Sequence, residues 1–326
     1  MVFMGAEKQG GAGGSDAMGP IAYIRKVGRG KTLSKDLGKD EARDAFQQLL
    51  AGRFSPAQTG AFLQALRIKE LSQDELDGLV EALGSRIPPA SSPPSGGFTL
   101  NLASDTPRKG GYASLLAAGF LAARGTPVGI VKSDPMLSGN QRAWDETWRM
   151  VGPSKPSVLD VYDLVPALKS LREIRKELGF RSCLHTAEKL LNPWPERPVV
   201  LGISHRHYAE RMAENLRRRG LIGKIVLGNH GTPDLALHKE TEVWEVLHGG
   251  EIRMIQIHPS DMGLQPESEV YTLGFFPKWE EELMREGFGA LGPVLLYHAA
   301  FLRYAAGEVA EPKEGVLSSS QLGGVA

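Results

Sequence analysis

The sequence contains a single cysteine, Cys183. A lone thiol excludes an intramolecular disulfide and a zinc cage built from cysteines, and it is typical of proteins in a reducing compartment. The chain also lacks an excess of charge, because 38 lysines and arginines are balanced by 38 aspartates and glutamates. This balance excludes a global attraction to nucleic acid or to an anionic membrane, so any basic site must be a local patch.

A long hydrophobic run is absent as well. The longest apolar stretch, from Phe288 to about Leu302, contains Tyr297 and His298 and falls short of the roughly 18 residues that span a bilayer. The glycine-rich N-terminus lacks the apolar core of a signal peptide. These absences predict a cytoplasmic protein without a membrane segment. We expect tails at residues 1–19 and 311–326.

Three short amphipathic helices are predicted near the N-terminus. Asp40 begins the first, in which apolar residues recur at helical spacing. Ser55 begins the second, since serine is a good N-cap residue. Ser72 and Glu75 have the spacing of a capping box and begin the third. Together they predict a small all-helical domain over residues 20–86.

A linker separates these helices from a second pattern. Residues 87–97 contain four prolines and two glycines, which permit neither a helix nor a central strand. Beyond them, predicted strands alternate with predicted helices, which indicates parallel βαβ units and a large α/β domain over residues 97–158 and 196–310. The expected strands are 98–102, 126–131, 198–204, 223–229, 241–247 and 251–257, and the expected helices are 111–125, 139–152, 164–179, 183–193, 207–220 and two near the C-terminus, from about 279 and from about 289 to 306.

Three stretches resemble one enzyme family. "SPAQTGAFLQALRIKELSQDEL" (55–76) is similar to the N-terminal helical domain shared by anthranilate phosphoribosyltransferases and pyrimidine nucleoside phosphorylases. "LGFRSCLHTAEKLLNPWPERPVVLGISHRHYAERMAENLRRRG" (178–220) resembles the family's central segment, and "HGTPDLALHKETEV" (230–243) resembles the segment after it. The "LLNP" turn followed by that strand and helix is the most specific part, and the resemblance covers roughly residues 21 to 306.

This resemblance to glycosyltransferase family 3 implies a fold, a partner and a reaction. The implied fold is a small helical domain, completed by helices from about 160–193, on a large α/β domain with a mainly parallel sheet, of the nucleoside phosphorylase/phosphoribosyltransferase type. The implied assembly is a homodimer through the helical domain. In the anthranilate enzymes an amine displaces pyrophosphate from phosphoribosyl pyrophosphate, which requires backbone N–H groups around the phosphates, Mg²⁺ and carboxylates to hold it.

The sequence departs from the family where the donor binds. The glycine-rich turn of the family should fall at about 102–106, which reads "LASDT", and the next motif near 130–134, which reads "IVKSD". The family's Asp-Glu metal pair aligns on Pro233 and Asp234, which leaves Asp234 as the candidate ligand for Mg²⁺. Standard anthranilate transfer is therefore expected to be lost, and no catalytic residue is assigned. The remaining candidates are Arg108, Lys109, Gly110, Ser114 and Lys132 for the donor phosphates, and Arg181 for an acceptor carboxylate.

A divergent branch of the family, the anthranilate-phosphoribosyltransferase-like proteins, is closer still. The similarity lies in "VGRGKTLSKDL" (27–37) and in His185, Thr186, Lys189 and Leu190. It implies loss of the standard activity and binding of nucleic acid. Two hypotheses remain: a transferase with a phosphoribosyl-type donor, and a non-catalytic protein that binds single-stranded nucleic acid. The candidate residues for nucleic acid are Arg25, Lys26, Arg29, Lys31, Arg108 and Lys109.

Some conspicuous residues favour structural roles. The arginines at 217–219 end a predicted helix, where cations offset the helix dipole. Trp144 and Trp148 are spaced for packing, and His205 and His207 are expected to be structural.

Overall fold

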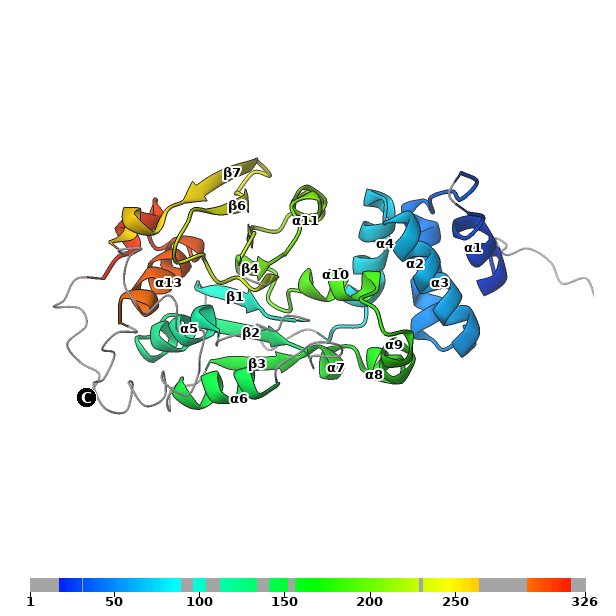
Figure 1. The fold of residues 1–326 in the computed structure, drawn as a ribbon, viewed down its shortest axis with the longest axis horizontal. Helices are drawn as coiled ribbons and strands as arrows, with labels where there is room; N and C mark the ends of the chain where they lie inside the picture. Colours follow the sequence, from blue (N-terminus) through cyan, green and yellow to red (C-terminus); the bar gives the residue numbers. More distant parts are fainter. Residues whose placement is uncertain are drawn as a thin grey trace, which may run out of the picture.

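The computed structural model describes residues 18–30, 32–88, 96–103, 112–133, 141–151, 156–228, 231–263 and 292–317. Figure 1 shows an elongated molecule, with helices α1 to α4 at one end and a sheet with its covering helices at the other. Among the described residues, no helix combines the length and the hydropathy needed to cross a membrane.

The helical bundle contains α1 (Pro20–Val27), α2 (Lys39–Leu50), α3 (Pro56–Lys69) and α4 (Gln73–Gly84). The three helices predicted from capping signals are confirmed. The Ser55 hydroxyl accepts a hydrogen bond from the Gln58 amide at 3.2 Å, and the Ser72 hydroxyl accepts one from the Glu75 amide at 3.2 Å. The apolar faces meet in a core where the Phe46 and Phe62 rings lie 5.4 Å apart.

Four short helices follow the third strand: α7 (Val161–Leu164), α8 (Pro166–Ser170), α9 (Arg172–Leu178) and α10 (Cys183–Lys189). The expectation of one continuous helix over 164–179 is wrong, because the helix is interrupted between α8 and α9. The Ser170 hydroxyl donates to the Ala167 carbonyl at 2.7 Å, a local bond that competes with continued helix. Helices α9 and α10 pack against α3, and α10 also packs against α4, so residues far along the chain complete the bundle.

The predicted α/β class with a mainly parallel sheet is confirmed. Seven strands lie in the order β3-β2-β1-β4-β5-β6-β7; neighbours from β3 to β5 are parallel, and β6 and β7 are antiparallel. Strand β3 was not expected, because its four residues, Ser157–Asp160, are partly exposed and form no buried apolar run like those of β1, β4 and β5. The strands are β1 (Phe98–Asn101), β2 (Val128–Lys132), β3 (Ser157–Asp160), β4 (Val199–Gly202), β5 (Gly223–Val226), β6 (Thr241–Val246) and β7 (Ile252–Ile257).

Helices cover both faces of the sheet. On one face α5 (Ala113–Ala123) packs on α13 (Gly292–Ala305), with α6 (Gln141–Met150) beside α5. On the other face, α11 (His207–Arg218) packs against β5, β6 and β7. The apolar core on the α11 side runs without interruption into the bundle, because Val199 and Leu201 of the sheet belong to the same buried cluster as Phe46 and Phe62. Two short 3₁₀ helices, Pro259–Met262 and Pro312–Gly315, complete the described fold.

Candidate functional site

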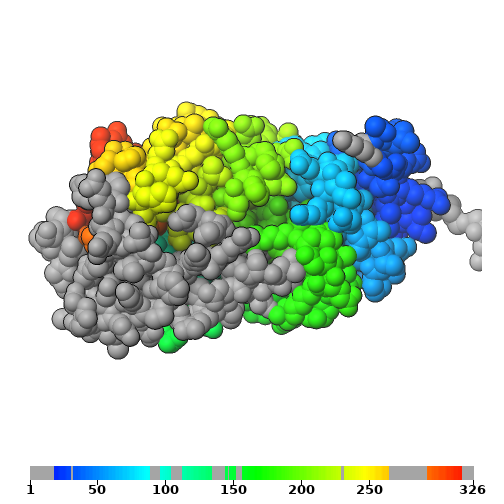
Figure 2. Space-filling model, in the orientation of Figure 1, coloured from blue at the N-terminus to red at the C-terminus, as the bar shows by residue number. Residues whose placement is uncertain are grey.

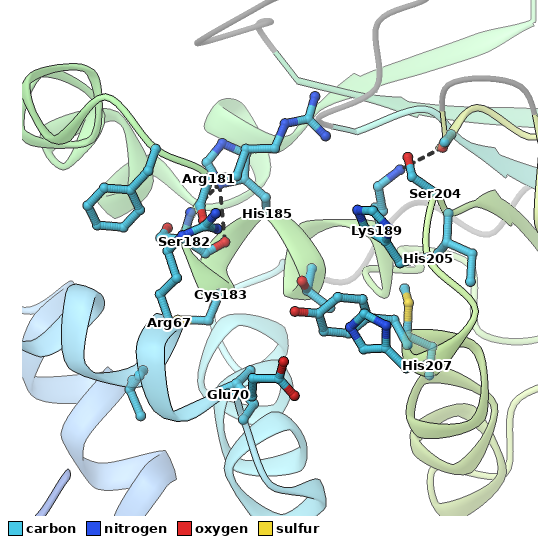
Figure 3. Close-up of a pocket in the computed structure, with 18 of the residues that line it drawn as sticks. Arg67, Glu70, Arg181, Ser182, Cys183, His185, Lys189, Ser204, His205 and His207 are labelled. Carbon is cyan, nitrogen blue, oxygen red and sulfur yellow. Dashed lines mark hydrogen bonds between the residues drawn. The ribbon is translucent and has the colours of Figure 1, made fainter. Parts of the chain in front are cut away.

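A cavity of about 600 Å³ lies between the helical bundle and the α/β part. Figure 2 shows the bundle, in blue and cyan, abutting the green segments that contain α7 to α11. Three segments line the cavity: the end of α3, the α9–α10 connection with α10, and the β4–α11 connection (Figure 3). We refer to it as the interdomain cavity.

The position of the cavity follows from the sheet topology. Strand β4 ends at Gly202, and small ligands of open α/β sheets bind beyond the carboxyl ends of parallel strands. The segment that begins at Gly231 crosses this end closely. A Cβ atom on Gly202 would lie 2.0 Å from the Thr232 carbonyl carbon, so only glycine permits the approach.

Three cationic side chains line the interdomain cavity. Arg181 is exposed, and its guanidinium forms no hydrogen bond or ion pair with the described residues. Arg67 donates to the Arg181 carbonyl and lies over the Phe180 ring, 5.5 Å from its centroid, so it holds the α9–α10 connection in place. Lys189 is buried and donates to the carbonyls of Gly202 at 2.7 Å and Gly231 at 3.1 Å. The cavity is therefore suited to an anion.

Two titratable residues of α10 stay uncharged at neutral pH. Burial, helped by the Arg175 guanidinium, lowers the pKa of His185 to about 3. Burial raises the pKa of the Cys183 thiol to about 12, so this thiol is no nucleophile at physiological pH. The His185 ring lines the cavity as a neutral hydrogen-bonding group, with Nδ1 3.2 Å from both the amide nitrogen and the carbonyl oxygen of Ser182.

Two of the candidate donor-site residues, Asp234 and Lys132, are engaged within the protein. Asp234 accepts a hydrogen bond from the Ser114 amide, with 2.8 Å between the Asp234 Oδ1 and the nitrogen, at the N-terminus of α5. The Ser114 hydroxyl is buried and has no partner among the described residues. Lys132 forms an ion pair with Asp160 at 2.9 Å and lies 5.7 Å from the centre of the Trp144 ring. Arg108, Lys109 and Gly110 lie outside the described residues.

The described residues do not by themselves form a Mg²⁺ site. Among the described residues, no group of three histidine, cysteine, aspartate or glutamate side chains is placed to hold a metal ion. Asp234 is the one carboxylate that the sequence pattern left for this role, and its Oδ1 already caps α5.

The candidate residues for nucleic acid are divided in the structure. Arg25 and Arg29, in and just after α1, are exposed, and neither has a partner among the described residues. Lys26 is paired with Glu41, with 2.5 Å between its ammonium and the carboxylate. Helix α1 lies at the outer end of the bundle, away from the sheet (Figure 1). Lys31, like Arg108 and Lys109, falls outside the described residues.

The arginines at 217–219 were expected to be structural, and the contacts of Arg218 and Arg219 are structural. Arg218 reaches across to α4 and bonds Asp77 at 2.8 Å, and Arg219 donates to the Leu190 carbonyl at 2.8 Å, so these two arginines connect elements in addition to offsetting a helix dipole. His205 and His207, expected to be structural, line the interdomain cavity. Trp144 and Trp148 do pack together, with ring centres 5.6 Å apart.

Arg67, Glu70 and Tyr208 line the cavity and were not predicted as site residues. Arg67 and Glu70 stand at the end of an amphipathic helix, where charged residues usually face solvent. No local signal in the sequence marked them, because the opposing wall of the cavity comes from residues more than a hundred positions later in the chain.

The fold combines a helical bundle, completed by a later segment, with a mainly parallel sheet, and a cationic cavity lies between the two. This arrangement is typical of nucleoside phosphorylase/phosphoribosyltransferase-type proteins. The chain belongs to glycosyl transferase family 3: the family's helical bundle domain matches residues 21–86, and its α/β domain matches residues 149–322. The resemblance seen in the sequence is thereby confirmed.

Similar proteins and structures agree with this assignment. An uncharacterized protein of Aquifex aeolicus is 28% identical over 312 residues, which cover 90% of this chain and 95% of that protein. The anthranilate phosphoribosyltransferase of Rhodopseudomonas palustris strain TIE-1 is 28% identical over 320 residues, 92% of each chain. The crystal structure of the Thermus thermophilus anthranilate phosphoribosyltransferase is similar with a TM-score of 0.70 at 23% identity, over 90% of this chain and 92% of that one.

A second structure shows the same fold with ligands. It is the Saccharomyces cerevisiae anthranilate phosphoribosyltransferase in complex with PRPP (phosphoribosyl pyrophosphate) and Mg, and it matches with a TM-score of 0.70 at 17% identity over 91% of each chain. At 17% sequence identity, this structural similarity establishes the shared fold alone.

Proposed function

We propose that the chain is a divergent phosphoribosyltransferase-type protein that binds a small anionic acceptor in the interdomain cavity and a phosphoribosyl-type donor beside it. The observation that carries the proposal is the cavity of about 600 Å³ with Arg67, Arg181 and Lys189 in its wall. A volume of several hundred Å³ with a few convergent polar groups is typical of small-ligand sites. The Arg181 guanidinium, unengaged by the described residues, has donors for a carboxylate or a phosphate.

The same geometry argues against standard anthranilate transfer. Lys132 forms an ion pair with Asp160, and the carboxylate of Asp234 accepts a hydrogen bond at the N-terminus of α5. In this proposal Mg²⁺ enters only as the companion of a donor's pyrophosphate, as in the yeast relative solved with PRPP and Mg. The proposed contribution of this chain is to bind and orient an anion and to exclude water from it, as substrate-positioning groups do.

Calorimetric titration tests the proposal. Phosphoribosyl pyrophosphate is titrated with and without Mg²⁺, and a panel of small carboxylates is titrated separately. We expect saturable binding of a carboxylate that Arg181→Ala weakens by at least about tenfold, because a hydrogen bond to a charged group is lost. Arg53→Ala changes an exposed arginine away from the cavity and should leave binding intact. Absence of heat with every carboxylate and with the donor at millimolar concentration would refute the proposal.

Binding of single-stranded nucleic acid is the second candidate. It is favoured by the two exposed arginines Arg25 and Arg29, which have no partner among the described residues. Phosphate contacts release counterions, so binding of a single-stranded oligonucleotide should weaken steeply with salt, and the double substitution Arg25→Ala/Arg29→Ala should reduce the slope by about one per lost contact. Binding without salt dependence would exclude this candidate.

A further inference from the structure

Strand β7 forms one edge of the sheet. It pairs with β6 on one side, and no strand among the described residues pairs with its other side. In Figure 1, β7 lies along the upper margin of the α/β part, and no labelled element lies beyond it. A strand in this position presents a row of backbone N–H and C=O groups that can pair with a further strand.

The register of β6 and β7 shows which residues present these groups. Along antiparallel strands, successive residues direct their backbone hydrogen bonds alternately to one side and to the other. Just beyond the ends of the two strands, the Leu247 amide donates to the Glu251 carbonyl at 2.9 Å. Continued along the strands, this alternation directs three residues of β7 toward β6: Arg253, Ile255 and Ile257. The backbone groups of the other three point away from β6 and have no hydrogen-bond partner among the described residues: Ile252, Met254 and Gln256.

Met254 adds exposed apolar surface to this edge. Its side chain is 39% exposed, and it lies directly opposite Trp244 of β6, which packs against the buried core. Edge strands are commonly protected from further pairing by unpaired charges. The one charged residue of β7, Arg253, is already paired with Glu245, with 2.6 Å between the guanidinium and the carboxylate. The edge therefore has apolar surface and unpaired backbone groups, and it has no unpaired charge to repel another strand.

The residue pattern of β7 is complementary to itself. If two β7 strands pair antiparallel about a two-fold axis through Met254, this residue lies opposite Met254 of the second copy. Ile252 then lies opposite Gln256 of the second copy, and the reverse pair follows from the symmetry. Every outward-facing residue of one strand thus exchanges backbone hydrogen bonds with an outward-facing residue of the other. The two exposed methionine side chains also cover each other.

Neighbouring registers satisfy the edge less well. An axis at Arg253 would place two like charges directly opposite each other, which is destabilising. An axis at Ile255 would place Ile252 opposite His258, which lies beyond the end of the strand and whose carbonyl already accepts a hydrogen bond from the Asp261 amide. With the axis through Met254, Arg253 lies opposite Ile255 of the second copy, so no charged residue of β7 directly faces another. Hydrogen bonding, apolar contact and charge favour the same register.

We propose that β7 is an interaction surface for a second copy of this chain, and that the two strands pair antiparallel about an axis through Met254 to join two sheets into one. A second copy is the partner because the strand complements itself in this register. The surface is separate from the helical bundle, whose dimerisation the sequence predicts. It is also independent of the proposed function, because no residue of β7 lines the interdomain cavity.

Engineered cysteines test the register. Met254→Cys places two thiols opposite each other at the axis, where the Cα atoms of a hydrogen-bonded pair are about 5.5 Å apart, within the range that a disulfide can bridge. Gln256→Cys lies on the same strand and face, but its copy is offset by about 13 Å along the strand, too far for a bridge. With copper phenanthroline as the oxidant, we expect an interchain disulfide for Met254→Cys and at least about tenfold less for Gln256→Cys in non-reducing electrophoresis. The native Cys183 is buried and should contribute little background.

Light scattering coupled to size exclusion tests the interface itself. Ile68→Lys provides the background, because it is designed to remove the predicted bundle interface. In this background we expect a dimer, and addition of Met254→Lys should give a monomer, since two ammonium groups would meet at the axis. Val316→Lys is the matched control, because Val316 is 38% exposed and Met254 is 39% exposed. Its addition should leave the dimer intact.

Each measurement can overturn the inference. Equal disulfide yields at positions 254 and 256, or no disulfide at either, would contradict the register. A monomeric Ile68→Lys protein, or a dimer that persists after addition of Met254→Lys, would show that β7 does not hold two copies together. Hydrogen exchange identifies coverage of the edge by another part of the same chain. Slow exchange of the Met254 amide in a monomer would show such coverage and would exclude a second copy there.

Discussion

The carboxylate of Asp234 accepts a hydrogen bond from the backbone amide of Ser114, with 2.8 Å between oxygen and nitrogen, at the N-terminus of α5. The two residues are 120 positions apart in the sequence, and their bond closes the segment after β5 onto the start of the helix after β1. The N-terminus of a helix attracts anions, and here the anion is a side chain of the protein itself.

Removal of this cap should destabilise the protein. We expect Asp234→Ala to lower the free energy of unfolding by about 1 kcal/mol, the usual value of a helix-capping side chain, and Asp234→Asn to cost less because it keeps an oxygen acceptor. Urea unfolding curves measure both. We also expect millimolar Mg²⁺ to leave the thermal midpoint unchanged. A Mg²⁺-dependent rise that Asp234→Asn abolishes would contradict this assignment.

Acidification should destabilise the protein in part through His185. Its pKa of about 3 lies below the ordinary value of 6.5, so between these pH values the unfolded chain binds a proton that the folded chain does not. Stability is therefore greatest above about pH 6.5 and falls as the pH is lowered toward 3. We expect His185→Gln to flatten the decline of the thermal midpoint between pH 7 and pH 4. His248→Gln, at an exposed histidine, should leave the profile as it is; equal profiles for all three proteins would refute the prediction.

Breaking the buried ion pair of Arg175 and Glu188 should cost more unfolding free energy than breaking an ion pair at the surface. Both side chains are 1% exposed, and their charged atoms are 2.5 Å apart. Glu188→Gln leaves a buried guanidinium without its counter-charge, which should cost about 3–5 kcal/mol in unfolding free energy. Glu173→Gln breaks the exposed pair with Lys176 and should cost less than about 1 kcal/mol. Denaturant titration measures the unfolding free energy of both variants. Similar losses of unfolding free energy would contradict the prediction that the buried pair contributes more than the exposed one.

Dimerisation through the bundle remains a prediction. Ile21 and Ile68 lie on bundle helices and are 55% and 70% exposed, so they offer apolar surface that a dimer interface would cover. If the bundle forms the interface, Ile68→Lys should shift the protein toward the monomer in light scattering coupled to size exclusion. Val316→Lys, at an exposed apolar residue at the other end of the molecule, should not. A monomeric unsubstituted protein would contradict the prediction.

The sequence predicted most of the elements but less of the site. Capping residues such as Ser55 and Ser72 act within one helical turn, so local sequence suffices to place α3 and α4. The interdomain cavity depends on the end of α3 meeting α10 and the β4–α11 connection, a relation that no local pattern contains. Arg181 was expected near an acceptor from a resemblance, whereas Glu70 was found only because the structure places it in the wall of the cavity. The pairing of Lys132 with Asp160 required knowledge that β3 lies beside β2.

The shared core of the bundle and the sheet has a consequence for how the molecule denatures. Phe46 and Phe62 belong to the same buried cluster as Val199 and Leu201, so neither part can lose its packing without exposing apolar surface of the other. The bundle is then no detachable module: cut away after residue 88, it would lose α9 and α10 together with the neighbours that cover its inner surface. Heat and denaturant should accordingly unfold both parts in one cooperative transition, and the cavity walls formed by the bundle and by the α/β part would be lost at the same temperature.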